Sequence, residues 1–262
     1  MQCNGCNGPS TRATARRYWF WGYIIIGVEA SRGITPRRAL FEQASRQGLV
    51  GADHNLGLIY EYGLGVAKDF AKAFGHYSRA AEAGIARSQF SLGVLYAAGR
   101  GVKQDYAQAM HWYRKSAAQG EREAMNNIGY LFEHGLGVAK NVAEATGRYR
   151  KAAEAGLPAA QFTMGNMYTR GIGVKADKAV ATAWYRKAAM AGYASAQSVL
   201  GYNLAQGEGV KADYVAAYMW IKLAADQGNA LAKKNLKDLA AVMKPDEIAR
   251  AEAMVKAWKP TK

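Results

Sequence analysis

The sequence predicts an all-α solenoid of antiparallel helix pairs, and three observations support this fold class. The segment LGLIYEYGLGVAKD, at Leu56–Asp69, recurs in varied form at Leu92, Ile128, Met164 and Leu200, with each start 36 residues after the last. The apolar residues inside each copy follow the helical period. Glycines and capping residues recur at fixed offsets, where helices would end and begin. A strict repeat of this length indicates units that bury their apolar faces against their neighbours.

Residues 1–34 form a basic and apolar segment that precedes the array. Its apolar stretch, Tyr18–Val28, is too short for a transmembrane helix, which needs about 20 residues. The length fits the apolar region of a secretory signal, and we expect export, to the periplasm in a bacterium, with cleavage after Ala30. A membrane-surface or buried terminal helix, a mis-assigned start of the reading frame and a cytoplasmic location remain alternatives.

Residues 35–50 are expected to form the second helix of an incomplete leading repeat, with Thr35 as N-cap and Pro36 at the first helical position. Residues 229–262 are expected to be capping helices. Asn229 starts a sixth unit that has no glycine loop, and Pro245 opens the last helix. Such caps cover the apolar faces of terminal repeats.

Five full repeats lie between these ends, and each predicts a first helix A, a glycine turn and a second helix B. In the first repeat, Gly63 and Gly65 end helix A, because glycine enters left-handed backbone geometry without a steric penalty. Asp69 then caps helix B, and an aspartate or asparagine stands at this position in every repeat. The predicted repeats are 51–84, 85–120, 121–156, 157–192 and 193–228.

A glycine also stands in the middle of every helix A, where it costs about 1 kcal/mol relative to alanine. Five copies at one offset predict a close approach of helix A to a helix B, with the ring of Tyr77 or Tyr113 over the gap. The role is structural rather than phosphate binding, because a nucleotide fingerprint follows a strand. These glycines are Gly57, Gly93, Gly129, Gly165 and Gly201.

These columns resemble the Sel1-like repeat family, relatives of the tetratricopeptide repeats. The resemblance is clearest in SLGVLYAAGRGVKQDYAQAMHWYRKSAAQG and extends over about residues 48–239. One departure is His76, which stands where other repeats carry Trp112, Trp184 and Trp220. The resemblance implies a right-handed superhelix that binds other proteins, as adaptors of bacterial signalling, envelope and host-interaction systems do.

The sequence offers little that points to catalysis. The four histidines occupy different repeat positions and are interpreted as isolated, surface or partly packed residues, and we expect no catalytic residue, metal or cofactor. Cys3 and Cys6 supply two zinc ligands where a structural site needs four, so an unstructured tail is favoured over a metal or redox role. Cysteine-rich relatives are credited with hydrolysing penicillin-like amides, but the repeats of this chain contain no cysteine.

The net charge of +15 leaves a second alternative, a binder of anionic polymers or membrane surfaces. Residues 1–50 hold seven arginines and two glutamates, and residues 229–262 hold eight lysines or arginines and four acids. Much of the excess therefore lies at the two ends. We favour a solvated basic surface, expect no specific nucleic acid partner, and leave open a weak association with anionic membranes.

The main functional hypothesis is a non-enzymatic scaffold that binds a protein or peptide and is itself a monomer. In tetratricopeptide-like solenoids helix A lines the concave surface, and a helical wheel places residues 55, 58 and 62 of each repeat in a stripe beside the core. Aromatic and arginine side chains dominate many binding surfaces. The predicted binding residues of the stripe are Tyr62, Tyr130, His134, Asn166, Arg170, Tyr202 and Gln206.

Overall fold

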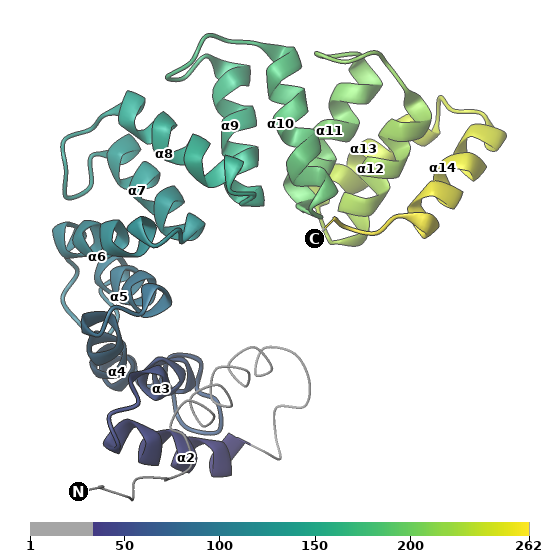
Figure 1. Ribbon diagram of the computed structural model, residues 1–262. Coiled ribbons are helices and arrows are strands. Elements are labelled where there is room, and N and C mark those ends of the chain that lie inside the picture. Colours follow the sequence, from purple (N-terminus) through teal and green to yellow (C-terminus); the bar gives the residue numbers. More distant parts are fainter. Residues whose placement is uncertain (1–33, 262) are drawn as a thin grey trace, which may run out of the picture. The chain divides into compact units, whose positions relative to one another are not determined.

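A computed structural model describes residues 34–261, and within that range it contains thirteen α-helices and no strand (Figure 1). The predicted α-solenoid architecture is thereby confirmed. The helices are α2 (Ile34–Arg46), α3 (Val50–Tyr62), α4 (Phe70–Glu82), α5 (Ala86–Ala98), α6 (Tyr106–Ala118), α7 (Arg122–His134), α8 (Val142–Glu154), α9 (Pro158–Arg170), α10 (Lys178–Met190), α11 (Ala194–Gln206), α12 (Tyr214–Asp226), α13 (Ala230–Ala240) and α14 (Pro245–Ala257).

The chain divides into two units, Met1–Ala124 and Met125–Lys262. In the first unit, α2 packs on α3, α3 on α4, α4 on α5 and α5 on α6. In the second unit, the helices from α8 to α13 pack in the same sequential way. Helices A and B therefore alternate, with α3, α5, α7, α9 and α11 as helices A of the five repeats.

The turns between helices A and B follow the sequence prediction. Gly63 and Gly65 have φ angles of 70° and 67°, in the left-handed region that favours glycine. The Asp69 carboxylate accepts a hydrogen bond from the Lys72 backbone N–H at 2.9 Å, which caps α4. The same cap recurs at the start of every later helix B, through Asp105, Asn141, Asp177 and Asp213.

The mid-helix glycines allow the close approach that the sequence predicted. A Cβ added at Gly93 would lie 2.6 Å from Tyr113 Cδ1, and one added at Gly129 would lie 2.9 Å from Tyr149 Cδ1. In the fifth repeat an isoleucine, Ile221, takes the place of the tyrosine and contacts Gly201. Gly57 and Gly165 face Tyr77 and Tyr185 in the same way, so the column is a packing feature of all five repeats.

Buried glutamines link one repeat to the next. Gln89 donates to the Ala81 carbonyl oxygen at 3.1 Å and accepts from Gln119 Nε2 at 2.8 Å. Gln197 forms the same pair of bonds, with Ala189 and with Gln227. Gln161 makes only the first of them, and within residues 34–261 its buried Oε1 meets no donor. The position equivalent to Gln119 is Ala191 in that repeat, which explains the missing partner.

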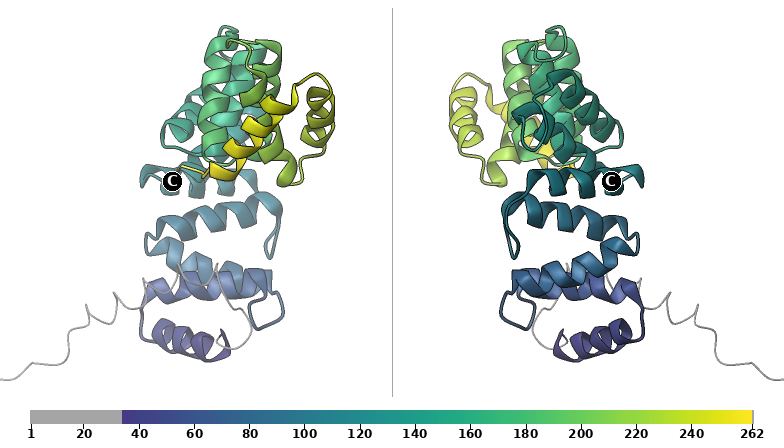
Figure 2. Two further views of the ribbon diagram at one scale, coloured as in Figure 1. Left: turned by 90° about the vertical axis from the view of Figure 1, so that its right-hand side faces the viewer. Right: turned by 90° about the vertical axis from the view of Figure 1, so that its left-hand side faces the viewer.

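The C-terminal helices cap the array by folding back. The Asn229 side chain caps α13, and α14 packs on α12 (Figure 2). The Trp258 ring meets Trp220 edge-on at a centroid distance of 6.0 Å, and the Thr261 backbone N–H donates to the Met190 carbonyl oxygen at 2.9 Å. The chain end thus covers helices B of the last two repeats.

One boundary differs at the other end of the described range. Helix α2 begins at Ile34, so Thr35 lies in its first turn and is not the N-cap that was predicted. Assignments of helix ends commonly differ by a residue or two, because terminal turns are weakly held. The predicted signal segment and the two cysteines lie outside the described residues, apart from residue 34.

Candidate functional site

The candidate site is the surface of the helices A of the second unit, α7, α9 and α11. It is formed by the residues equivalent to positions 58 and 62 of the first repeat. Leu56, Leu92, Ile128, Met164 and Leu200 form the core column of these helices and are at most 1% exposed. Two positions further along, Tyr130 is 50% exposed and Tyr202 is 46% exposed. Large rings at these positions therefore stand out toward solvent rather than into the core.

On α7, two aromatic side chains lie one helical turn apart and in contact. The rings of Tyr130 and His134 have centroids 4.3 Å apart at an angle of 50°. Glu133 lies beside them and accepts a 2.7 Å hydrogen bond from the Tyr149 hydroxyl of α8. Burial, together with this carboxylate, raises the pKa of Tyr149, so its hydroxyl stays protonated and keeps the glutamate in place.

On α9, one predicted residue is engaged by the fold and the other is free to reach a partner. Asn166 is partly buried, and its Oδ1 accepts a 2.8 Å hydrogen bond from the Tyr185 hydroxyl of α10. Arg170 is exposed at the end of the helix. Gln206 occupies the equivalent position on α11 and is exposed as well. The second unit thus presents two tyrosines, a histidine, an arginine and two amides on one repeating pair of positions.

The first unit contributes Tyr62 of α3, which is 59% exposed. At the third position of the predicted stripe, Asn55 of the first repeat is not a surface residue, whereas its equivalents in the other repeats are partly exposed. Asn55 is only 7% exposed, and its Nδ2 donates to the Gly51 carbonyl oxygen at 3.2 Å. The helical wheel placed Asn55 beside the core face, and in the structure it is buried.

Two tryptophans of helix B, Trp112 and Trp184, pack against lysine side chains. Lys115 Nζ lies 4.6 Å from the centre of the Trp112 ring, and Lys187 Nζ lies 4.2 Å from that of Trp184. Both tryptophans are partly buried, and Trp220 is 7% exposed. A lysine already occupies one face of each of the first two rings, where a cationic ligand would have to stack.

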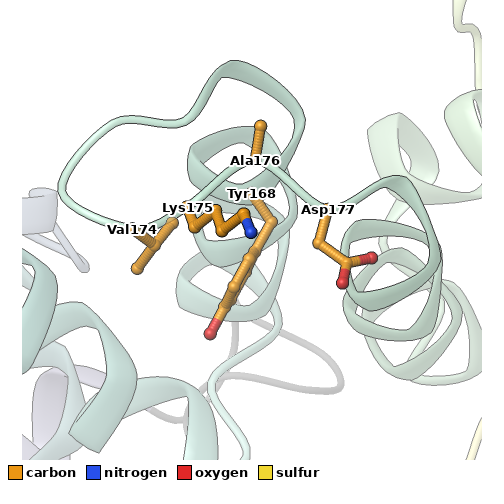
Figure 3. Close-up of a pocket in the computed structure, with 5 residues that line it drawn as sticks. All are labelled: Tyr168, Val174, Lys175, Ala176 and Asp177. Atoms are coloured by element: carbon orange, nitrogen blue, oxygen red, sulfur yellow. The ribbon is translucent and has the colours of Figure 1, made fainter.

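An open hollow of about 420 Å³ lies at the turn of the fourth repeat, lined by Tyr168, Val174, Lys175, Ala176 and Asp177 (Figure 3). The Asp177 carboxylate accepts from the backbone N–H groups of Ala179 and Val180 at 2.9 Å, so it serves as the cap of α10. The Asp177 backbone N–H also donates a hydrogen bond to the Tyr168 carbonyl oxygen. These residues belong to the turn that recurs in every repeat, and they form no set of catalytic groups.

The interpretation of the histidines as isolated residues was wrong for His76. Its Nδ1 lies 2.9 Å from Asp53 Oδ1, although 23 residues separate the two in the sequence. Pairing of α3 with α4 brings them together, which helical periodicity within one helix does not reveal. The replacement of the usual tryptophan by His76 was the signal that could have found this contact. Within residues 34–261, no group of three or more histidine, cysteine, aspartate or glutamate side chains is placed to hold a metal ion.

The comparison with protein families matches the Sel1 repeat at five consecutive segments, residues 51–85, 86–121, 122–157, 158–193 and 194–229. The chain belongs to the Sel1 repeat family. Members of this family generally act as scaffolds for interactions between proteins rather than as enzymes. None of the curated proteins matches this chain.

Solved structures agree with this membership. A protective antigen of uropathogenic Escherichia coli with an SLR fold is 33% identical, with a TM-score of 0.76, over 93% of this chain and 53% of that one. This chain therefore corresponds to about half of that protein. A Sel1 repeat protein from Oxalobacter formigenes is 37% identical, with a TM-score of 0.70, over 79% of this chain and 87% of that one. An immunity protein from Pseudomonas aeruginosa shares the fold, at 20% identity over 85% of this chain and 83% of that one, with a TM-score of 0.57.

Proposed function

We propose that this Sel1 repeat protein is a non-enzymatic scaffold that binds a protein or peptide partner on the helix A surface of its second unit. The observation that carries the proposal is the exposure of Tyr130 and Tyr202, each about half accessible beside a fully buried core column. Tyrosine offers a large contact area with few rotatable bonds, so little conformational freedom is lost when it is covered. Arg170 and the amides of Asn166 and Gln206 supply hydrogen bonds to a peptide backbone or to side chains.

The surface suits an extended partner because its polar groups differ from one helix to the next. Each helix would contact a different part of the partner. Helix α7 offers an aromatic pair, α9 an arginine and an amide, and α11 a tyrosine and an amide. A surface built in this way selects a sequence rather than a single small molecule. The hydrolase alternative lacks a comparable observation, because the polar clusters within residues 34–261 serve caps and packing.

The proposal can be tested by capture of partners from extracts of the native host with the immobilised chain. Tyr130→Ala and Arg170→Ala should each weaken binding of a stoichiometric partner at least tenfold, since central aromatic and arginine anchors typically contribute about 2 kcal/mol or more. Tyr214→Ala is the matched control, because Tyr214 is 45% exposed but lies on helix B of the fifth repeat. Equal binding by all three variants and the unchanged chain would refute the assignment of this surface.

We also propose that the protein is exported and acts in the bacterial envelope or in envelope signalling. This rests on the arginines and the apolar stretch of residues 1–34, whose length fits a secretory signal. Within residues 34–261, none of the helices is both long and apolar enough to cross a membrane. An intact Met1 on the protein isolated from the cytosol of its host would contradict export.

A further inference from the structure

The first repeat and the residues that it contacts on either side differ from the rest of the array at several positions that meet in space. Alanine stands at every equivalent of Ser45 and of Ser88 in the array. The equivalents of Asp53 are glutamine in three of the four other repeats, and those of His54 are phenylalanine in two. Alanine, glutamine and phenylalanine carry no titrating group. The first repeat has three titrating groups at its helix contacts, namely Asp53, His54 and His76.

Three of these departures, Ser45, Asp53 and His76, form one cluster with Arg79 around the Asp53 carboxylate, and Asp53 is 3% exposed. Its Oδ1 accepts a 3.0 Å hydrogen bond from Ser45 of α2 and lies 2.9 Å from His76 Nδ1 of α4. The Arg79 guanidinium donates to the same oxygen from Nε at 3.1 Å and from Nη2 at 2.6 Å. The cluster therefore joins α2, α3 and α4 through one buried charge that is paired.

The neighbouring residue makes a different contact, across the joint between the first two repeats. His54 Nδ1 lies 2.9 Å from the hydroxyl oxygen of Ser88, a fully buried residue of α5. From α4, the ring of Tyr77 covers the imidazole at a centroid distance of 5.7 Å. From α5, the charged group that acts on His54 is Arg87, which also lies 3.8 Å from Glu121.

A proton on His54 would therefore be poorly accommodated. The Asp53 carboxylate, next in the chain, is directed at α2 and α4 and already has its partners. The Tyr77 hydroxyl donates to Glu61 at 2.7 Å, so that carboxylate is engaged too. A partly buried imidazolium without a paired carboxylate, and with an arginine nearby, destabilises the packing that encloses it.

We propose that the joint between the first and second repeats is an acid-sensitive hinge, in which protonation of His54 against Ser88 loosens α2, α3 and α4 from α5. The later repeats stay folded, because at the joint between the fourth and fifth repeats the positions equivalent to His54 and Ser88 carry Phe162 and Ala196. The proposal concerns regulation of the array and does not depend on which surface binds the partner.

The range of pH follows from the direction of the shift. Burial, with a smaller contribution from Arg87, lowers the pKa of His54 from 6.5 to about 4. A group with a lowered pKa in the folded state makes folding weaker as the pH falls below its unfolded value. The stability of the joint should therefore fall from pH 6.5 down to about 4.

Burial of Asp53 opposes ionisation, but the hydrogen bonds from Arg79, His76 and Ser45 outweigh it and lower the pKa of Asp53 below 3.8. This carboxylate therefore contributes only at lower pH.

Hydrogen exchange of the full chain, corrected for the intrinsic effect of pH, tests the hinge. Between pH 7 and pH 5, amide protection in α3 and α4 should fall by about 20-fold, the value that the two pKa values of His54 imply. Protection in α9 and α10 should change much less. The variant His54→Phe/Ser88→Ala installs the residues found at the joint between the fourth and fifth repeats and should abolish the difference between the two pairs of helices.

Ser88→Ala alone is the matched control, because it keeps the partly buried imidazole and should keep the response to acid. If the double variant fails to fold at pH 7, His54→Asn, which copies Asn126 of the third repeat, takes its place with the same expected result. A parallel loss of protection in α3 and α9, or a variant without His54 that responds to acid as the unchanged chain does, would overturn the proposal.

Discussion

The mid-helix glycines provide the sharpest test of how the repeats are held together. At residue 129 of α7, an alanine Cβ would lie 2.9 Å from two carbons of the Tyr149 ring and 3.2 Å from the Ala145 carbonyl oxygen. Both contacts are too short, so the tyrosine or the backbone of α8 would have to move. Overpacking of this kind typically costs about 1–3 kcal/mol.

Gly147 of α8 is the matched control. It also lies inside a helix, but it is exposed and a Cβ there would meet nothing within 4 Å. Gly147→Ala should therefore stabilise the chain by up to about 1 kcal/mol, through helix propensity alone. Gly129→Ala gains the same stability from helix propensity but loses more through overpacking. The free energies of unfolding of the two variants should therefore differ by about 1–3 kcal/mol.

Urea unfolding of the two variants and the unchanged chain measures this difference. Gly129→Leu should extend the trend, because a longer side chain cannot fit between α7 and α8. If Gly129→Ala and Gly147→Ala stabilise the chain equally, the close approach does not constrain the residue, and the explanation of the glycine column is wrong.

The remaining predictions concern a buried amide, a helix cap and the N-terminal segment. Ala191→Gln should stabilise the chain by about 1 kcal/mol by giving Gln161 Oε1 its missing donor, whereas an unchanged unfolding midpoint would mean that Oε1 is already satisfied. Asn141→Ala should cost about 1 kcal/mol, because the Glu144 backbone N–H loses its 3.0 Å cap, and retention of full stability would contradict that role. Sequencing of the exported protein should give a new terminus at Ser31, and any other terminus would exclude cleavage after Ala30.

The parts of the fold that could be predicted depend on contacts within one repeat. Gly63 and Asp69 act on their own turn, so their spacing was enough to place the end of α3 and the start of α4. The contact of Gly57 with Tyr77 spans two helices, but its repetition in the array made it visible. Repetition thus supplied the information about packing that a single copy of the sequence lacks.

The parts that could not be predicted are those where one repeat departs from the rest. The cluster of Ser45, Asp53 and Arg79 joins three helices, and no local spacing places these side chains together. The burial of Asn55 was missed because a helical wheel treats a helix alone and omits its neighbours. A comparison of columns could have found the cluster, since residues that depart together from a repeat pattern are candidates for contact.

The central claim is that the helix A surface, rather than exposure in general, determines binding. A photoreactive phenylalanine placed at Tyr202 and, separately, at Tyr214 tests it most directly, because the two side chains are 46% and 45% exposed but lie on helices A and B of one repeat. On irradiation in the native host, the probe at residue 202 should form a single stoichiometric adduct with a partner protein, and the probe at 214 should form none. The same adduct from both positions, or from residue 214 alone, would contradict the account.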